Sequence, residues 1–414
     1  MIVETAQAPA TDESPFGFDE LFFSRTDPHG IIQSGNQVFQ RVSGYSWEKL
    51  VGSPHKLIRH PGTPRAVFWQ LWRTIQAGAP IGAYVKNRAR DGRHYWVFAI
   101  VSAIDDGYLS VRLKPSSQTF VQVQDDYAKL VQSEAQDRST PAESATALLA
   151  HLQAYGHPTY ESFMAVALSE EVRARAQHLG HPVDGKVLLF DQLLRLAENL
   201  LLRAVEIAAA HRENAYIPLN LRVRASQLGG DGVVIGAISQ NFKVINDELS
   251  VAVTRFQQSA QRVSQAISHG LFLICTATLQ SEICEIFARE PSSGEFCAEG
   301  ETLRLNQQQA RCNAQALDGL DAISRQTRAF RTDCAEMSRL AASLEVTRIM
   351  GKVETARVEV TRTGLSDLLD ELAGFQRALA VGLRDLDRGN DEIIERTDAL
   401  LAARGEDQVA GRRW

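Results

Sequence analysis

Residues 16–116 show short runs of alternating hydrophobic and polar positions, interrupted by turn residues. Such alternation predicts half-buried strands. Asp91-Gly92 between two of these runs is a strong hairpin signal, and Asp105-Asp106-Gly107 marks another tight turn. The five predicted strands are residues 21–27, 30–36, 85–88, 94–104 and 108–113.

A helical pattern separates the first two strands from the last three. Pro64 suits the first turn of a helix, and Gly78 suits its end. Residues 37–45 and 47–50 predict two shorter helices. In the longer helix one side is strongly apolar, with Val67, Phe68, Leu71, Trp72 and Ile75 at spacings of three and four. The whole pattern predicts an α+β domain with an antiparallel five-stranded sheet and helices.

Near Asp125 the apolar positions change to helical periodicity. Predicted helical segments cover residues 144–168, 186–210, 237–288 and 303–344 and continue to residue 403. A seam close to a heptad repeat is formed by Val234, Ile238, Phe242, Ile245, Leu249 and Val253. Long helices with such a seam predict an all-α elongated helical bundle or coiled-coil module.

These patterns divide the 414 residues into five parts. We expect a disordered leader (1–15), the α+β domain (16–116), a linker (117–143) with a polar, proline-bearing stretch, a helical signalling or dimerisation domain (144–403) and a flexible tail (404–414).

Composition and charge narrow the class of protein. A content of 44% hydrophobic and 23% charged residues is typical of a soluble globular protein, and a net charge of −6 gives no strong attraction to nucleic acid. Residues 16–115 hold 13 Lys/Arg and 7 Asp/Glu, so the α+β domain is modestly basic. This bias suits contact with acidic helices or with an anionic cofactor; a chance surface bias is the alternative.

The cysteines and apolar runs point to a cytoplasmic protein. Without a C-x-x-C pair, the five cysteines are expected to be small buried hydrophobic residues rather than zinc ligands or disulfides. The most apolar run, residues 270–279, is too short to cross a bilayer, and the N-terminus lacks the features of a signal peptide. We therefore expect no membrane span.

Several motifs occur in order within the α+β domain. They are N-x-x-F-x-x-V-S-G-Y (36–45), G-x-P-H (52–55), R-H-P-x-x-P (59–64), F-W-x-x-W (68–72), V-K-N-R (85–88) and D-G-x-x-Y-W-V (91–97). Together they resemble the PAS domain at the front of bacterial aerotaxis receptors, over residues 16–116.

That resemblance implies a pocket between sheet and helices that holds FAD, and cofactor-binding roles for Asn36, Arg59, His60 and Asn87. An arginine can pair with a diphosphate, and an amide can both donate to and accept from a flavin ring. Trp72 and Trp96 complete the predicted set, with core packing as their alternative role. For Arg59 and His60 the alternative is a structural corner that bonds backbone carbonyls.

Two positions depart from the family pattern. Gly62 stands where the family usually has an aspartate, and Ile81 stands where it favours a tryptophan. Each change removes a contact that could hold a flavin. An empty or differently occupied pocket therefore remains the alternative to FAD.

Residues 217–245 bear a faint likeness to the signalling tip of methyl-accepting chemotaxis proteins. The matching positions are Leu219, Asn220, Ala225, Gly229, Gly232, Val233 and Val234. Acidic and arginine residues of that tip are missing, so a related domain would be degenerate. The alternative is an unrelated helical bundle with a glycine-rich kink.

A sensor-like domain joined to helices predicts a soluble sensory signal-transduction protein of the chemoreceptor or aerotaxis type. It would relay a redox, oxygen or small-ligand state to a protein partner. We expect a homodimer, with a chemotaxis coupling protein or a histidine kinase as further partner, and no enzymatic activity. The alternative is a non-catalytic scaffold or adaptor whose PAS domain mediates dimerisation and binds no cofactor.

Overall fold

The computed structural model describes residues 12–290, 296–357 and 364–409, without the side chains of residues 230, 231 and 403–409. The predicted leader lies largely outside the described residues, as do the last residues of the predicted tail. The chain divides into two compact units. The first comprises Met1–Asp191 with Ser268–Leu317, and the second comprises Gln192–Ile267 with Asp318–Trp414.

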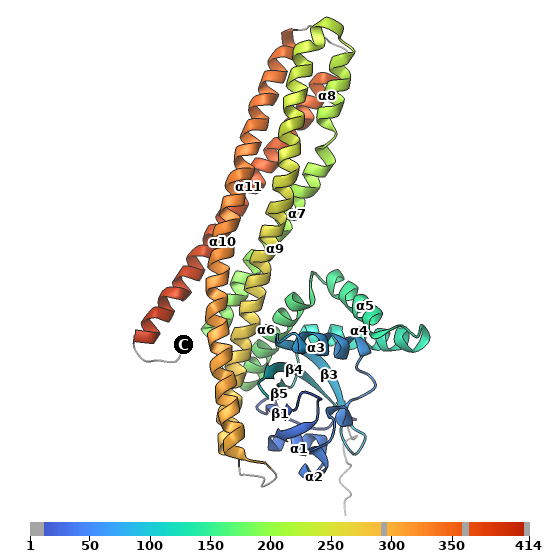
Figure 1. Ribbon diagram of the computed structural model, residues 1–414, viewed down its shortest axis with the longest axis vertical. Helices are drawn as coiled ribbons and strands as arrows, with labels where there is room; N and C mark the ends of the chain where they lie inside the picture. The colour runs from blue at the N-terminus through green and yellow to red at the C-terminus, as the bar shows by residue number, and fades with distance from the viewer. Residues whose placement is uncertain (1–11, 291–295, 358–363, 410–414) are drawn as a thin grey trace, which may run out of the picture. The chain divides into compact units, whose positions relative to one another are not determined.

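The first unit contains a five-stranded antiparallel sheet in the order β2-β1-β5-β4-β3. Strands β1, β5, β4 and β3 are labelled in Figure 1. Its strands are β1 (Phe22–Thr26), β2 (Ile32–Gly35), β3 (Ile81–Arg88), β4 (His94–Ile104) and β5 (Gly107–Leu113). Gly92 closes the β3–β4 hairpin with a φ of 94°, a conformation that glycine adopts without strain. The predicted α+β fold and its five strands are confirmed.

Short helices lie between β2 and β3. They are α1 (Gln37–Ser43), α2 (Trp47–Leu50), the 3-10 helix η1 (His55–Ile58) and α3 (Arg65–Gln76). Helix α3 starts after Pro64 and buries Val67 and Ile75, while Phe68, Leu71 and Trp72 are only half-buried. The apolar side of α3 therefore covers the sheet incompletely, and a cavity remains beneath it.

The predicted linker at 117–143 needs correction. Most of it is a helix, α4 (Gln118–Gln136), which buries Val123, Tyr127 and Leu130. The Tyr127 hydroxyl donates to the Tyr84 carbonyl of β3 at 3.1 Å, so α4 is attached to the sheet. Apolar residues at spacings of four and three outweigh the polar composition of this segment, because they provide one buried helix face.

The other helices of the first unit follow α4. They are α5 (Pro141–Ala154) and α6 (Tyr160–Leu179), where one helix over 144–168 was predicted. A Thr140–Glu143 capping box starts α5, and Thr159 caps α6. These two caps, with Gly156 and Pro158 between the helices, divide the predicted helix in two.

Long helices make up the second unit and contribute to the first. They are α7 (Gly185–Asn214), α9 (Val233–Arg289), α10 (Ala298–Arg357) and α11 (Leu365–Val409), and the shorter α8 (Ile217–Ser226) lies between α7 and α9 along the chain. Helix α11 extends into the predicted tail. The short 3-10 helix η2 (Gly229–Gly232) precedes α9 at the predicted glycine-rich kink.

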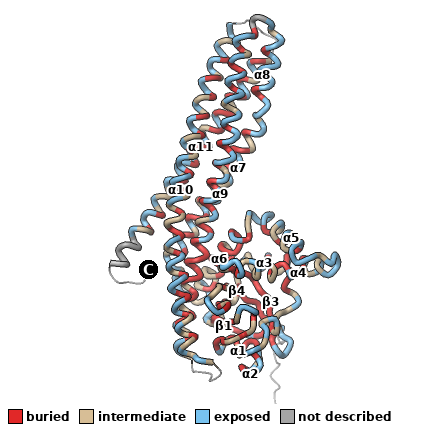
Figure 2. The backbone as a smooth tube through the Cα atoms, in the orientation of Figure 1, coloured by how far each residue is buried: buried red, intermediate tan, exposed pale blue. Residues whose placement is uncertain are grey.

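Four of the six residues of the predicted seam on α9 are buried: Ile238, Phe242, Leu249 and Val253. Ile245 is half-buried, and Val234 is 51% exposed. Phe256 of α9 stacks on Phe330 of α10 at 5.0 Å. Figure 2 shows buried positions repeating along one side of each long helix.

Helix α9 is, among the described residues, the one helix that is long and apolar enough to cross a membrane by length and composition. Because 67% of its most apolar window is buried inside the protein, the core helix of a soluble protein would give the same pattern. The absence of a membrane span stays a prediction. Of the cysteines, Cys275, Cys284, Cys312 and Cys334 are buried as expected, whereas Cys297 is exposed.

Candidate functional site: a cavity between sheet and helix α3

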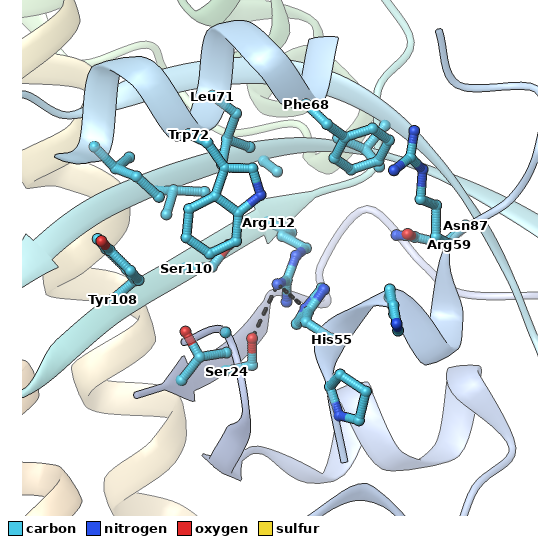
Figure 3. A pocket seen from close by; sticks show the side chains of 18 of the residues that line it. Ser24, His55, Arg59, Phe68, Leu71, Trp72, Asn87, Tyr108, Ser110 and Arg112 are labelled. Carbon is cyan, nitrogen blue, oxygen red and sulfur yellow. Dashed lines mark hydrogen bonds between the residues drawn. The ribbon is translucent and has the colours of Figure 1, made fainter. Parts of the chain in front are cut away.

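A cavity of about 310 Å³ lies between α3 and one face of the sheet (Figure 3). Phe68, Leu71, Trp72 and Ile75 of α3 form one wall. The opposite wall consists of alternate residues of β3, β4 and β5: Val85, Asn87, Ala99, Val101, Tyr108, Ser110 and Arg112. This volume is at the lower end of the range of small-molecule sites and suits one planar ring system.

Arg112 is a buried cation in the wall of this cavity. It is 4% exposed, and its Nη2 donates to Ser24 Oγ at 2.9 Å and to His55 Nε2 at 2.8 Å (Figure 3). Its Nη1 is buried without a hydrogen-bond partner among the described residues, and none of their carboxylates forms an ion pair with it. Burial lowers the pKa of Arg112 to about 10, so the guanidinium is still charged near neutral pH.

His55 lies beside Arg112 as a neutral ring. Burial, with Arg112 as a second cause, lowers the pKa of His55 to about 3. Because Arg112 donates to Nε2, the proton of the neutral imidazole must be on Nδ1. His55 therefore accepts a hydrogen bond from Arg112 and cannot neutralise its charge.

Asn87 and Arg59 provide further hydrogen-bond donors in another part of the lining. Asn87 is 2% exposed, and its side-chain amide makes no hydrogen bond to any residue that the structure describes. The Arg59 guanidinium stacks over the Phe68 ring at 3.7 Å. Burial lowers the pKa of Arg59.

Three of the six predicted site residues line the cavity: Arg59, Trp72 and Asn87. Trp72 packs edge-to-face on Tyr108 at 5.5 Å, so these two rings form an aromatic corner. The structure thus brings together residues from α3, β3 and the segment after η1.

Asn36 does not line the cavity, because its side chain serves the backbone. Its Oδ1 accepts from the Phe23 amide at 3.0 Å and the Phe39 amide at 3.3 Å, which caps α1. Its Nδ2 donates to the Leu21 carbonyl at 2.8 Å. The amide that the resemblance implied as a flavin contact ties β1 to α1 instead.

The His60 side chain bonds within its own loop rather than lining the cavity. Its Nδ1 accepts from the Gly62 amide at 2.9 Å. A Cβ at position 62 would lie 2.9 Å from that nitrogen, so the glycine leaves the space that the imidazole occupies. Gly62 is therefore compatible with this placement of His60, which lies outside the cavity lining.

Trp96 faces the other side of the sheet. It pairs with Lys86 across the β3–β4 hairpin, and Lys86 Nζ lies 5.7 Å from its ring. Phe120 and Tyr127 of α4 cover it at 5.4 and 6.0 Å. Trp96 is a packing residue beneath α4.

Sequence reasoning missed the polar residues of β5 and β1. Tyr108, Ser110 and Arg112 alternate with Leu109, Val111 and Leu113, and this alternation alone would place a polar stripe in solvent. The alternation itself could have indicated this wall of the cavity. Alternate residues of β5 lie on opposite faces of the sheet, so either the polar or the apolar set had to share the face of Asn87. His55 stands in the G-x-P-H motif (52–55), but that motif alone assigns no role to its ring.

The reverse face of the same sheet is covered by helices. Tyr84 of β3 donates to Glu171 of α6 at 2.8 Å, and Phe23 of β1 packs on Phe287 of α9 at 5.3 Å. Arg25 of β1 forms an ion pair with the buried Glu301 of α10 at 2.8 Å. Strand residues therefore alternate between the cavity and these helices.

Comparison with known proteins agrees with this fold. Residues 33–111 match the family model of the PAS fold, so this part of the chain is a PAS domain. The aerotaxis receptor of Escherichia coli (strain K12) is 35% identical over 122 residues, which are 28% of this chain and 24% of the receptor. A nitrogen fixation regulatory protein of Klebsiella pneumoniae is 34% identical over 74 residues, or 18% of this chain and 15% of that protein.

Among solved structures, the light state of the blue-light photoreceptor Aureochrome1 LOV aligns at a TM-score of 0.22 and 24% identity, over 28% of this chain and 90% of that chain. A likeness of this size supports no conclusion about function. The chain spans about a quarter or less of the length of the curated relatives named above. The chemoreceptor likeness of the helical region stays a prediction.

The residue types that line the cavity are suited to binding a flavin ring. Trp72 and Tyr108 offer flat apolar contact, the Asn87 amide offers an unused donor and acceptor, and Arg112 offers an unused donor. Arg59 provides a cation for a phosphate.

Proposed function

We propose that the chain is a sensory signal-transduction protein whose PAS domain binds a small ligand, in the first place a flavin, and relays its state to a protein partner. The observation that carries this proposal is the two-sided sheet. Asn87 and Arg112 face the cavity, whereas Tyr84 and Arg25 on the reverse face bond to helices α6 and α10.

Asn87, Arg112 and Arg59 would hold the flavin, which when bound would supply a reversible change of redox state. These side chains bind and orient the group, while Trp72 and Leu71 exclude water from it. A change of charge or protonation on the bound group would alter the hydrogen bonds that Asn87 and Arg112 make to it.

The relay then follows the strands. A shift of Arg112 in β5 moves Val111 and Leu113, whose side chains are on the reverse face, and β5 pairs with β1, which carries Arg25. Arg25 bonds to Glu301 of α10, a helix that continues to Arg357. The ligand would shift the population between two packings of the helices on the sheet.

The visible spectrum of the purified full-length protein, with mass spectrometry of its acid extract, tests the ligand. We expect flavin absorption in the blue and a flavin in the extract. A colourless, folded protein from cells and from incubation with FAD would contradict the flavin proposal.

Hydrogen–deuterium exchange of the oxidised and the reduced protein tests the relay. We expect redox-dependent exchange in α10 that is lost in Glu301→Gln, because the neutral amide weakens the link to Arg25. Glu299→Gln is the matched control, since Glu299 is an exposed carboxylate in the same first turn of α10. Equal redox responses in the wild type and both variants would refute a relay through Glu301.

A further inference from the structure

Arg112 differs from the other buried arginine of the described residues. Arg175 is 7% exposed and pairs with Glu282 at 2.8 Å. Arg112 is 4% exposed, and among the described residues its side chain has only the Ser24 hydroxyl and the neutral His55 ring as hydrogen-bond partners. A buried charge without a counter-ion is strongly destabilising.

Two neighbouring residues on one face of β5 each have a polar side-chain atom without a hydrogen-bond partner in the described part of the chain. Arg112 Nη1 and Ser110 Oγ are both buried and lack hydrogen-bond partners among the described residues. The two residues are on the same face of the strand, two positions apart, and both line the cavity. Buried polar groups are normally satisfied, so two unsatisfied ones in one cavity wall indicate a missing acceptor.

We propose that the ligand presents an anionic oxygen to Arg112 Nη1 and Ser110 Oγ, and that the cavity selects a planar organic anion. This inference rests on the proposal that the cavity is the sensing site. Trp72 and Tyr108 supply the flat contact, and the guanidinium supplies the counter-charge. The oxygen can come from the ring of a reduced flavin, which carries the negative charge, or from the carboxylate of a small aromatic acid.

Local charge supports an anion rather than a neutral ligand. Lys56, Arg59 and Arg112 line the cavity, and its lining contains neither aspartate nor glutamate. His55 stays neutral and therefore adds no counter-charge. A ligand with one negative charge would balance Arg112 and satisfy its free N–H in a single contact.

If the purified protein contains a flavin, its reduction potential tests the proposal. Reduction adds negative charge to the ring, so a neighbouring cation favours it. We expect Arg112→Gln to shift the potential downward and Arg112→Lys to restore most of it. Arg88→Gln, an exposed arginine of β3, is the control. An unchanged potential in a fully occupied Arg112→Gln protein would overturn the proposal while leaving the flavin assignment intact.

If the protein is colourless, the flavin assignment fails and thermal unfolding tests the anion site alone. Benzoate, salicylate and 2-furoate are compared with their neutral amides. We expect the acids to raise the Tm more than the amides do, and Arg112→Gln to weaken the apparent Kd more than about tenfold while Arg88→Gln leaves it unchanged. Equal effects of acids and amides, or no effect of either in the wild type, would overturn the proposal.

Discussion

Arg112 and Arg25 are arginines of adjacent strands in opposite electrostatic surroundings. Replacing Arg112 by Met removes a charge without a counter-ion, and we expect the free energy of unfolding of the ligand-free protein to rise by about 1 kcal/mol. Arg25→Met leaves the carboxylate of Glu301, whose side chain is 3% exposed, without its main partner. That change should cost about 3 kcal/mol.

Urea unfolding followed by tryptophan fluorescence checks this pair of variants. Trp47, Trp69, Trp72 and Trp96 all lie in the PAS domain, so the signal reports mainly on that domain. Similar losses of stability in both variants would mean that Arg112 is a structural residue.

His55 gives the stability a pH dependence. Its pKa is about 3 in the folded protein and near 6.5 when unfolded, so the unfolded chain binds the proton more readily. Stability from this residue is present above the unfolded pKa and is lost as the pH falls toward the folded value. Between pH 7.5 and 5.5 the loss should be about 1 kcal/mol.

The matched variant for that titration is His55→Gln, which keeps a neutral acceptor for Arg112. Urea unfolding at several pH values should show a flatter profile for this variant than for the wild type. Parallel profiles would show that His55 titrates normally in the folded protein.

At the residue scale, the sequence predicted the site only in part. Arg59, Trp72 and Asn87 were found through motifs, but a motif does not state which way a side chain faces. Trp96 could have been excluded from the site by the alternation of side chains along a strand. It pairs with Lys86, the neighbour of Asn87, and so lies on the opposite face of the sheet from Asn87. Asn36 could not have been excluded from the sequence, because the same asparagine amide can either cap a helix or contact a ligand.

At the element scale, the sheet was predictable because its signals are local. The Asp91-Gly92 turn sets the β3–β4 register, and alternation identifies each strand. The linker at 117–143 was wrong because composition was given more weight than periodicity. Val123, Tyr127 and Leu130 are apolar at helical spacing, and what they pack on is known only from the tertiary structure.

Glu171 is the element-scale link between α6 and the sheet. It is fully buried and accepts from the Tyr84 and Ser117 hydroxyls at 2.8 and 2.6 Å, and from the Ser116 amide at 2.7 Å. Burial raises its pKa. Glu171→Gln turns an NH₂ group toward these donors, so we expect a loss of about 3 kcal/mol in the free energy of unfolding.

Glu170→Gln is the matched control for that measurement. Glu170 is the neighbouring carboxylate, half-buried, with one hydrogen bond from the Thr119 hydroxyl at 2.5 Å. Its loss should stay below about 1 kcal/mol in the same urea experiment. Equal effects would show that the buried donors around Glu171 rearrange to satisfy themselves.

For the whole molecule, α9 and α10 matter because each contributes residues to both compact units. Their first-unit residues contact the sheet through Phe287 and Glu301. The second unit also has an apolar groove, on which the predicted homodimer can be tested. The groove between its α9 and α10 is lined by Val234, Ile238, Ile349, Met350 and Val353, with Ala237, Asn241 and Glu354.

The predicted homodimer can be tested on that groove with two valines of equal exposure. Val353 of the groove and Val381 of α11 are both 49% exposed, so a lysine at either position should perturb the fold of the helix similarly. If two copies pair through the groove, Val353→Lys places a charge in an apolar interface and should raise the dimer dissociation constant more than about tenfold, whereas Val381→Lys should not.

Sedimentation velocity over a range of concentrations measures the dissociation constants of both variants. Equal dissociation constants for the two variants would move the interface away from this groove, and a monomeric wild type at all concentrations would contradict the homodimer itself.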